Sequence, residues 1–174
     1  MRLPTAAFQG YTTGSPLVDV DGDDTILKYT GSGTYVHGTA SPFMDYLVVA
    51  GGGGGGAYNG GGGGAGGLRT SYGDTSGGGA TSESSITLAA GTYTITVGSG
   101  GNGQSGSTQS QGGTDSSIAA SGLTTITSVG GGAGGGYTGS FYSATTGGSG
   151  GGGAYAVTAT GASGTSNQGY AGGS

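Results

Sequence analysis

The feature that most constrains this fold is a short apolar strand that runs directly into glycine. Tyr46-Leu47-Val48-Val49-Ala50 is followed by residues 51–67, in which 13 of the 17 positions are glycine. Two interpretations compete for such a segment. It is either a flexible tether of the Gly/Ser type or an ordered lattice in which glycine backbones lie side by side.

The composition favours order. Glycine occupies 50 of the 174 positions, but charged residues make up only 6% of the chain, and 11 tyrosines accompany many Thr, Val and Ile residues. Disordered chains usually combine high net charge with few β-branched or aromatic residues. The chain has no cysteine, which excludes disulfides and thiolate metal sites. Its conventional core is therefore thin, and tyrosine supplies most of the large side chains.

The apolar patterns predict strands and no amphipathic helix. A first hairpin is expected from 25–30 and 34–37, and a second from 85–88 and 92–97. In the second, Tyr93, Ile95 and Val97 share one face and threonines the other. The other expectations are a strand over 43–50, buried on both faces near its end, weaker strands over 123–129 and 155–160, and an irregular attachment segment over 1–24.

The predicted fold class is all-β with polyglycine-II helices. Glycine runs can adopt a threefold extended backbone without internal hydrogen bonds, and adjacent runs can then pair their amides laterally. Fixing glycine costs about 1–2 kcal/mol per residue against roughly 1 kcal/mol per hydrogen bond, so strands must anchor the runs. We expect residues 1–45 to form an attachment segment with a hairpin and residues 46–174 a glycine-rich domain. The glycine blocks are 51–56, 60–64, 77–79, 98–103, 130–136 and 147–153.

Several segments of the sequence resemble motifs of a known family. The segment 45–50 with 51–56 resembles the opening signature of the glycine-rich domains of bacteriophage tail fibres and related surface proteins. Residues 91–101 and 112–117 resemble later motifs of the same family. Residues 28–35 resemble the hairpin that commonly precedes the glycine-rich domain. The resemblance extends over roughly residues 25–136.

This resemblance implies a non-enzymatic virion protein of the tail fibre or its tip, in which inserts between the glycine runs contact a host receptor. The implied partners are a cell-surface protein or glycan and other tail-fibre proteins, with a homotrimer expected in a shaft and a monomer in a cap. The N-terminal residues contain no apolar stretch typical of a signal peptide, and the expected location is the virion. The inserts are 57–59, 68–76, 104–111, 137–146 and 162–170.

Aromatic side chains in these inserts are the candidate receptor contacts, because tyrosine offers a large contact area at low entropic cost. Tyr137, Phe141 and Tyr142 are the preferred ones. The alternative is that the rings only cover the glycine core. The full candidate set is Tyr58, Asn59, Tyr72, Tyr137, Phe141, Tyr142 and Tyr170.

Other chemistries find little support. The net charge is −5 and the three cations are scattered, so we expect no nucleic-acid partner. The acidic run 19–24 fails the calcium-loop pattern because Asp24 and Thr30 stand where Gly and Glu are required. His37 has no nearby nucleophile, and we expect no enzymatic activity, cofactor or metal. The rival functions are a self-assembling extracellular filament or matrix protein and, less favoured, an ice-binding protein.

Overall fold

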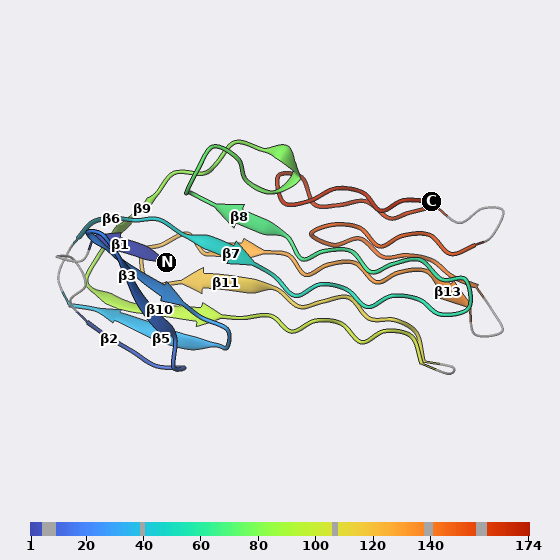
Figure 1. Cartoon of the computed structure of the whole chain (residues 1–174), viewed down its shortest axis with the longest axis horizontal. Coiled ribbons are helices and arrows are strands. Elements are labelled where there is room, and N and C mark those ends of the chain that lie inside the picture. The colour runs from blue at the N-terminus through green and yellow to red at the C-terminus, as the bar shows by residue number, and fades with distance from the viewer. Residues whose placement is uncertain (5–9, 39–40, 106–107, 138–140, 156–159) are drawn as a thin grey trace.

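The protein is elongated, with β-strands at one end and long, nearly parallel segments at the other (Figure 1). The computed structural model describes residues 1–4, 10–38, 41–105, 108–137, 141–155 and 160–174. These residues contain no α-helix and one 3₁₀ turn, η2. The elements are β1 Arg2–Pro4, β2 Gly10–Thr12, β3 Leu17–Asp21, β4 Asp24–Lys28, β5 Gly33–His37, β6 Ser41–Met44, β7 Leu47–Val49, β8 Leu68–Thr70, η2 Gly77–Gly79, β9 Ile86–Leu88, β10 Gly91–Thr96, β11 Ser116–Ala119, β12 Ile126–Ser128, β13 Gly136–Tyr137 and β14 Phe141–Tyr142.

All the named strands pair in antiparallel fashion. The largest sheet has the order β12-β11-β10-β5-β2, and a second has the order β1-β4-β3. The pairs β6-β9, β7-β8 and β13-β14 complete the set. The all-β class predicted from the sequence is therefore confirmed.

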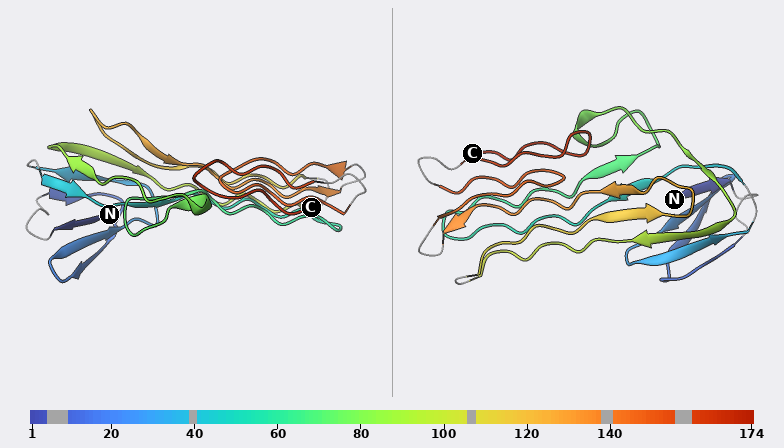
Figure 2. Two further views of the ribbon diagram at one scale, coloured as in Figure 1. Left: turned by 90° about the horizontal axis from the view of Figure 1, so that it is seen from above. Right: turned by 180° about the vertical axis from the view of Figure 1, so that it is seen from behind.

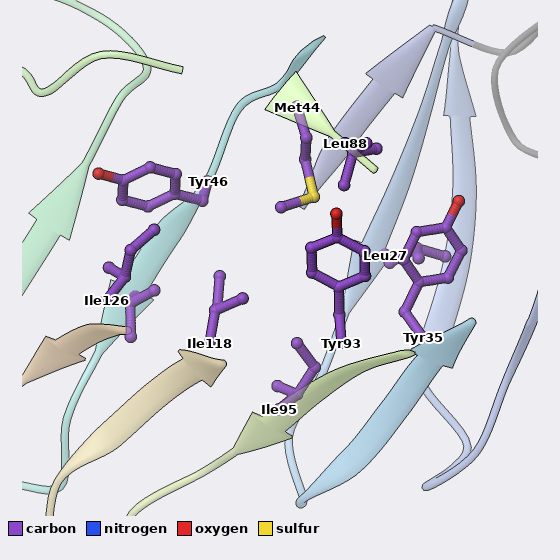
Figure 3. Packing of buried hydrophobic residues seen from close by; sticks show 10 residues of the cluster. Leu27, Tyr35, Met44, Tyr46, Leu88, Tyr93, Ile95, Ile118 and Ile126 are labelled. Atoms are coloured by element: carbon purple, nitrogen blue, oxygen red, sulfur yellow. The ribbon is translucent and has the colours of Figure 1, made fainter. Parts of the chain in front are cut away.

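The first predicted hairpin is wrong, although both of its strands exist. β4 pairs with β1 and β3, whereas β5 pairs with β10 and β2. The turn at 31–33 therefore connects two different sheets. Leu27 of β4 and Tyr35 of β5 are fully buried and belong to the same core cluster (Figure 3). The two strands meet through their apolar side chains instead of through a hydrogen-bonded ladder.

The second predicted hairpin is wrong for a similar reason. β9 pairs with β6, and β10 pairs with β11 and β5. At the corner between β9 and β10, the Tyr93 hydroxyl accepts from the amide of Ala89 at 2.9 Å and donates to its carbonyl oxygen at 3.1 Å. The tyrosine side chain thus satisfies backbone groups that a hairpin would have paired. The predicted alternation in β10 is confirmed, because Tyr93 and Ile95 are buried and its threonines are exposed.

The N-terminal segment is more ordered than the sequence suggested. β3 and β4 form a hairpin through the acidic turn, with Asp21 opposite Asp24, and β2 extends the largest sheet. The expectation of irregular structure over 1–24 is therefore wrong for the described part of that segment. Glycine and aspartate mark the turn correctly, but β3 is exposed along its whole length and lacks the alternation that identifies half-buried strands.

The predicted strand over 43–50 is split into β6 and β7, and its end is buried on one face only. Val48 is 7% exposed, whereas Leu47 and Val49 are 58% and 51% exposed. The inner face of β7 packs against β11 and β12, and the Ser128 hydroxyl donates to the Val48 carbonyl at 2.8 Å. Consecutive apolar residues here reflect an uncovered sheet face instead of burial on both sides.

Beyond β7, β10 and β12 the backbone continues into extended segments that we call the glycine rods. In Figure 2 they form a flat slab that continues from the strands. Glycines with positive φ all lie outside them within the described chain. The glycine rods are 51–56, 60–67, 98–104, 109–115, 130–135, 147–153 and 168–173.

Hydrogen bonds between rods recur every third residue. Gly131 and Gly134 donate to the carbonyl oxygens of Gly51 and Gly54 at 2.8 and 2.9 Å. Residues 61, 64 and 67 donate in the same way to the carbonyls of residues 135, 132 and 129. This repeat is expected of polyglycine-II helices, which have three residues per turn. The helical assignment itself stays a prediction, and amide exchange would test it.

Close approach explains why the rods require glycine. Residues 130–136 are buried without interruption. A Cβ atom at Gly131 would lie 2.1 Å from the Gly64 carbonyl oxygen, and one at Gly53 would lie 2.0 Å from that of Gly132. Neither side chains nor backbone shifts could relieve such contacts cheaply within a packed lattice.

Two glycine-based expectations differ from the structure. Residues 77–79 form η2, with positive φ at Gly78 and Gly79, and so are not a rod. Conversely, the rod 109–115 overlaps the predicted insert 104–111, because Gln111 accepts from Gly54 and donates to Asn102 within the lattice. The predicted strand 155–160 lies largely outside the described residues.

Candidate functional site

Several exposed aromatic residues belong to segments at the end of the rods farthest from the two larger sheets, the end at which Figure 1 labels β13. Tyr58, Phe141 and Tyr155 are 69%, 60% and 83% exposed, and Tyr137 is 38% exposed. We call the set Tyr58, Asn59, Tyr137, Phe141, Tyr142 and Tyr155 the distal tip.

The turn at 57–59 reverses the chain between the first two rods. Tyr58 and Asn59 both adopt the left-handed conformation, with φ of 52° and 62°. The Gly56 amide closes the turn by donating to the Gly61 carbonyl at 2.9 Å. A bulky residue such as tyrosine is uncommon at positive φ. The lattice imposes this conformation and holds the Tyr58 ring out into solvent.

Gln104 joins two parts of the distal tip. Its side-chain carbonyl oxygen accepts from the Ala57 amide at 2.8 Å, and its Nε2 donates to the Tyr137 carbonyl at 2.8 Å. The amide of Tyr155 donates to the Asn59 carbonyl, also at 2.8 Å. These bonds fix the positions of the turn 57–59 and the β13–β14 hairpin relative to each other.

The β13–β14 hairpin presents a pair of rings. Tyr137 lies opposite Phe141 in the ladder, and their ring centroids are 4.8 Å apart with an interplanar angle of 47°. Neighbouring rings at this separation stabilise each other. Tyr142, the next residue along, is half-buried. The hairpin therefore offers a preformed aromatic surface with limited freedom to reorient.

A concave region lies near β8, at the other end of the rods. We call it the polar groove. It is open, with a volume of about 630 Å³, and it is lined by Arg69, Ser76, Ala80, Thr81, Ser82, Glu83, Ser166, Asn167 and Gln168.

The charged side chains of the polar groove, Arg69 and Glu83, form an ion pair. Arg69 contacts both carboxylate oxygens of Glu83, with Nε to Oε1 at 2.7 Å, and the Tyr46 hydroxyl donates to Oε2 at 2.8 Å. The hydrogen bond from Arg69 lowers the pKa of Glu83, and burial, which would raise it, is the smaller effect. Glu83 therefore stays a carboxylate with its acceptor positions in use. This arrangement is typical of a structural ion pair and unlike a general acid or base, which needs a pKa near the working pH.

The family of the chain follows from its sequence. A family model described as glycine-rich domain matches residues 28–174. The chain belongs to this glycine-rich domain family. Comparison with curated proteins and with solved structures gives no match.

Two of the predicted contact residues of this glycine-rich domain lie away from the distal tip. Tyr72 follows β8, and the Arg2 guanidinium stands 4.8 Å from its ring centroid. The carbonyl of Tyr170 accepts from Gly150 at 2.9 Å, on the side of the rod 147–153. The structure thus brings together Tyr58, Asn59, Tyr137, Phe141 and Tyr142, and separates Tyr72 and Tyr170 from them.

Sequence reasoning missed Gln104 and Tyr155 as members or supports of this site. Tyr155 follows a glycine run as Tyr137 does, which is a usable signal. Nothing in the sequence distinguishes Gln104 from the other polar residues near it.

The remaining candidates do not form sites within the described residues. No group of three His, Cys, Asp or Glu side chains comes together there. His37 is buried, and its Nδ1 contacts the Tyr35 hydroxyl at 2.7 Å. In the same part of the chain, no helix has the length and apolar character needed to cross a lipid bilayer.

Proposed function

We propose that this glycine-rich domain is a non-enzymatic structural protein of a bacteriophage tail fibre or its tip, located in the virion, and that its distal tip binds a receptor on the host surface. The receptor is a cell-surface protein or glycan. The other partners are neighbouring tail-fibre proteins, with a trimer in a shaft position or a monomer in a cap position.

The observation that carries the receptor proposal is the clustering of exposed rings at one end of the lattice. Three exposed aromatic side chains lie close to rod ends: Tyr58 on the turn 57–59, Phe141 in β14 and Tyr155 after the rod 147–153. Aromatic rings on rigid supports are efficient binding residues, because little entropy is lost when they engage a partner. The two larger sheets occupy the opposite end, which leaves the distal tip free to contact a surface (Figure 1).

The assignment to a phage rests on the motif resemblance, chiefly residues 45–56. Membership of the family is a coarser statement and is compatible with other surface or fibre roles. The low charge of the rods also suits a passive support: residues 51–67 contain no acidic or basic side chain.

The binding test uses fluorescently labelled protein and a panel of bacterial strains. A strain that binds the wild type should lose at least about tenfold in affinity when Tyr137, Phe141 and Tyr142 are all replaced by alanine, since buried aromatic anchors dominate interfaces. The matched control replaces Tyr72 and Tyr170, which are exposed but distant from the distal tip. Equal loss in both variants, or unchanged binding of a folded triple variant, would count against the distal tip.

Electron microscopy separates this proposal from the filament alternative. A fibre component that needs its phage partners should remain as short particles when purified alone. Open-ended polymers formed without other proteins would favour the filament or matrix function.

A further inference from the structure

Some glycines in the rods are not required by the packing of a single chain. A Cβ atom at Gly52 or Gly55 would approach no atom closer than 3.7 Å, and at Gly100 and Gly103 the nearest atoms are 3.6 and 3.5 Å away. At Gly62 nothing lies within 4 Å. All of these are ordinary or absent contacts, in contrast to the 2.0 Å found at Gly53. We call these five glycines the open face.

The open face is one continuous surface over three neighbouring rods. A Cβ atom at Gly100 would have the Gly52 carbonyl oxygen of the next rod as its nearest neighbour. A Cβ atom at Gly52 would in turn have the Gly64 carbonyl oxygen of the rod after it as its nearest neighbour. The other side of the middle rod is covered, because Gly51 and Gly54 bond to rods 109–115 and 130–135. The five glycines therefore point away from the rest of the lattice.

The open face has unused donors and, on one rod, unused acceptors. The carbonyls of Gly52, Gly55 and Gly62 accept from Gly101, Gln104 and Gly152, whereas those of Gly100 and Gly103 accept from no backbone amide of the described residues. Among the described residues, the amides of Gly52, Gly55, Gly62, Gly100 and Gly103 donate to no protein acceptor. The pairs 52 and 55, and 100 and 103, keep the three-residue spacing that joins rods inside the slab. Each rod also alternates donors and acceptors along its length, so a glycine rod is the natural complement of another glycine rod.

We propose that the open face pairs with the open face of a second copy of this chain, so that two slabs join through backbone hydrogen bonds. A partner must present peptide groups every third residue and approach as closely as glycine allows, and the chain itself carries such a surface. No charged side chain occurs in 51–67 or 98–103, so neither attraction nor repulsion between charges directs the contact. A two-fold arrangement places the same patch on both partners.

The exposed side of β7 enlarges this interface. β7 leads directly into the rod 51–56, and its inner face packs on β11 and β12, the strands joined to the covering rods. Leu47 and Val49 therefore lie on the same side as the open face, with more than half of each side chain exposed. Burial of these two residues in the pair would add an apolar contribution.

The size of the contact sets its strength. Six residues at about 3.1 Å each, across three rods spaced by roughly 5 Å, give on the order of 300 Å² per copy. This is well below the roughly 800 Å² per partner of a stable complex, so the pair should be weak in dilute solution. It would become populated at high protein concentration or when copies are tethered together in a larger assembly.

The test is sedimentation equilibrium of the whole chain from about 5 to 500 µM. The wild type should shift from monomer to dimer over this range. The double variant G52T/G55T should stay monomeric with unchanged thermal stability, because a Cβ atom at either position has room in the single chain and the added side chains prevent the rods from meeting. The control G31T makes the same chemical change at another glycine with open space around it and should dimerise like the wild type.

The outcomes are decisive in both directions. Concentration-dependent protection of the Gly52 and Gly55 amides in the wild type, absent in G52T/G55T, would support the pairing. A wild type that remains monomeric at 500 µM would overturn it, and so would a folded G52T/G55T variant that still dimerises. Indefinite polymers would also overturn it, since a two-fold contact closes on itself.

Discussion

Gly134 donates its amide hydrogen to the carbonyl oxygen of Gly54 at 2.9 Å, across two segments that are 80 residues apart in the sequence. Three residues earlier in both segments, the Gly131 amide donates to the Gly51 carbonyl oxygen in the same way. Long-range contacts that helices and core side chains usually provide are made here by peptide groups. The stability of the slab therefore depends on how closely the backbones can approach.

Substitution of neighbouring glycines should have opposite effects. Gly53→Ala places a methyl group 2.0 Å from a backbone oxygen, whereas Gly52→Ala meets nothing closer than 3.7 Å. We expect G53A to lower the free energy of unfolding by at least about 2 kcal/mol. G52A should be neutral or gain about 0.5 kcal/mol from a less flexible unfolded chain. Urea unfolding of dilute protein measures both, and equal losses would contradict the lattice geometry.

Amide exchange should identify the centre of the slab. Residues 130–136 are continuously buried, and Gly131, Gly132 and Gly134 donate to carbonyls of other rods. Their amides should exchange at least about a thousandfold more slowly than those of an unstructured peptide. Gly22, in the exposed turn between β3 and β4, is the internal reference and should exchange fast. Peptide-like rates at 131–134 would show that the rods are not ordered.

The positions of the rods could be predicted from the sequence better than their partners. Strands β7, β10 and β12 do lead into glycine runs, because strand-forming residues and glycine change abruptly at Gly51, Gly98 and Gly130. That β4 and β5 belong to different sheets could not be predicted. A short Gly-Ser-Gly link is compatible both with a hairpin and with a corner between sheets. The choice between them depends on the distant strands that β4 and β5 pair with.

The distal tip was predicted in its residue types but not in its arrangement. The sequence left open whether the aromatic rings of the inserts contact a receptor or cover the glycine core, and Tyr58 and Phe141 are exposed in the structure. The insert expected over 104–111 overlaps the start of the rod 109–115, which contains few glycines, yet Gln111 bonds through its backbone. Side chains that point outward do not hinder backbone pairing, so glycine content alone understates the extent of the lattice.

Gln104 should act as a positioning residue for the distal tip. In Gln104→Glu the acceptor for the Ala57 amide remains, but the donor to the Tyr137 carbonyl is lost. Gln104→Ala removes both. We expect amide exchange at Ala57 to accelerate in Q104A and to change little in Q104E, with the melting temperature altered by only a few degrees in either. Identical exchange at Ala57 in both variants would contradict this role.

The Arg69–Glu83 pair should make an acid-sensitive contribution to stability. Arg69 and the Tyr46 hydroxyl lower the pKa of Glu83, so the folded state favours the carboxylate. This stabilisation is present above the unfolded pKa, 4.5, and is lost as the pH falls toward the lower folded value. Glu83→Gln should cost about 2 kcal/mol at pH 7 and flatten the stability profile below pH 4.5. The control Asp23→Asn, at an exposed turn residue, should do neither.

His37 should add a second, distinct pH dependence to the free energy of unfolding. Its side chain is 1% exposed, burial lowers its pKa, and Nε2 has no partner within the described residues. The neighbouring titratable group is Tyr35, whose pKa burial raises to about 12, so it remains a neutral hydroxyl. With the folded pKa below the unfolded value of 6.5, the unfolded state binds the proton first. Stability is therefore full above pH 6.5 and decreases below it, at up to about 1.4 kcal/mol per pH unit.

The variant that tests this effect is His37→Gln, which keeps a polar group beside the Tyr35 hydroxyl but does not titrate. Urea unfolding between pH 7 and pH 5 should show a falling free energy for the wild type and a flat profile for H37Q. At pH 7 the variant should be the less stable of the two, since the glutamine amide fills the ring site poorly, and the difference should shrink as the pH is lowered. Parallel profiles for the two proteins over this range would show that His37 is protonated equally in the folded and unfolded states.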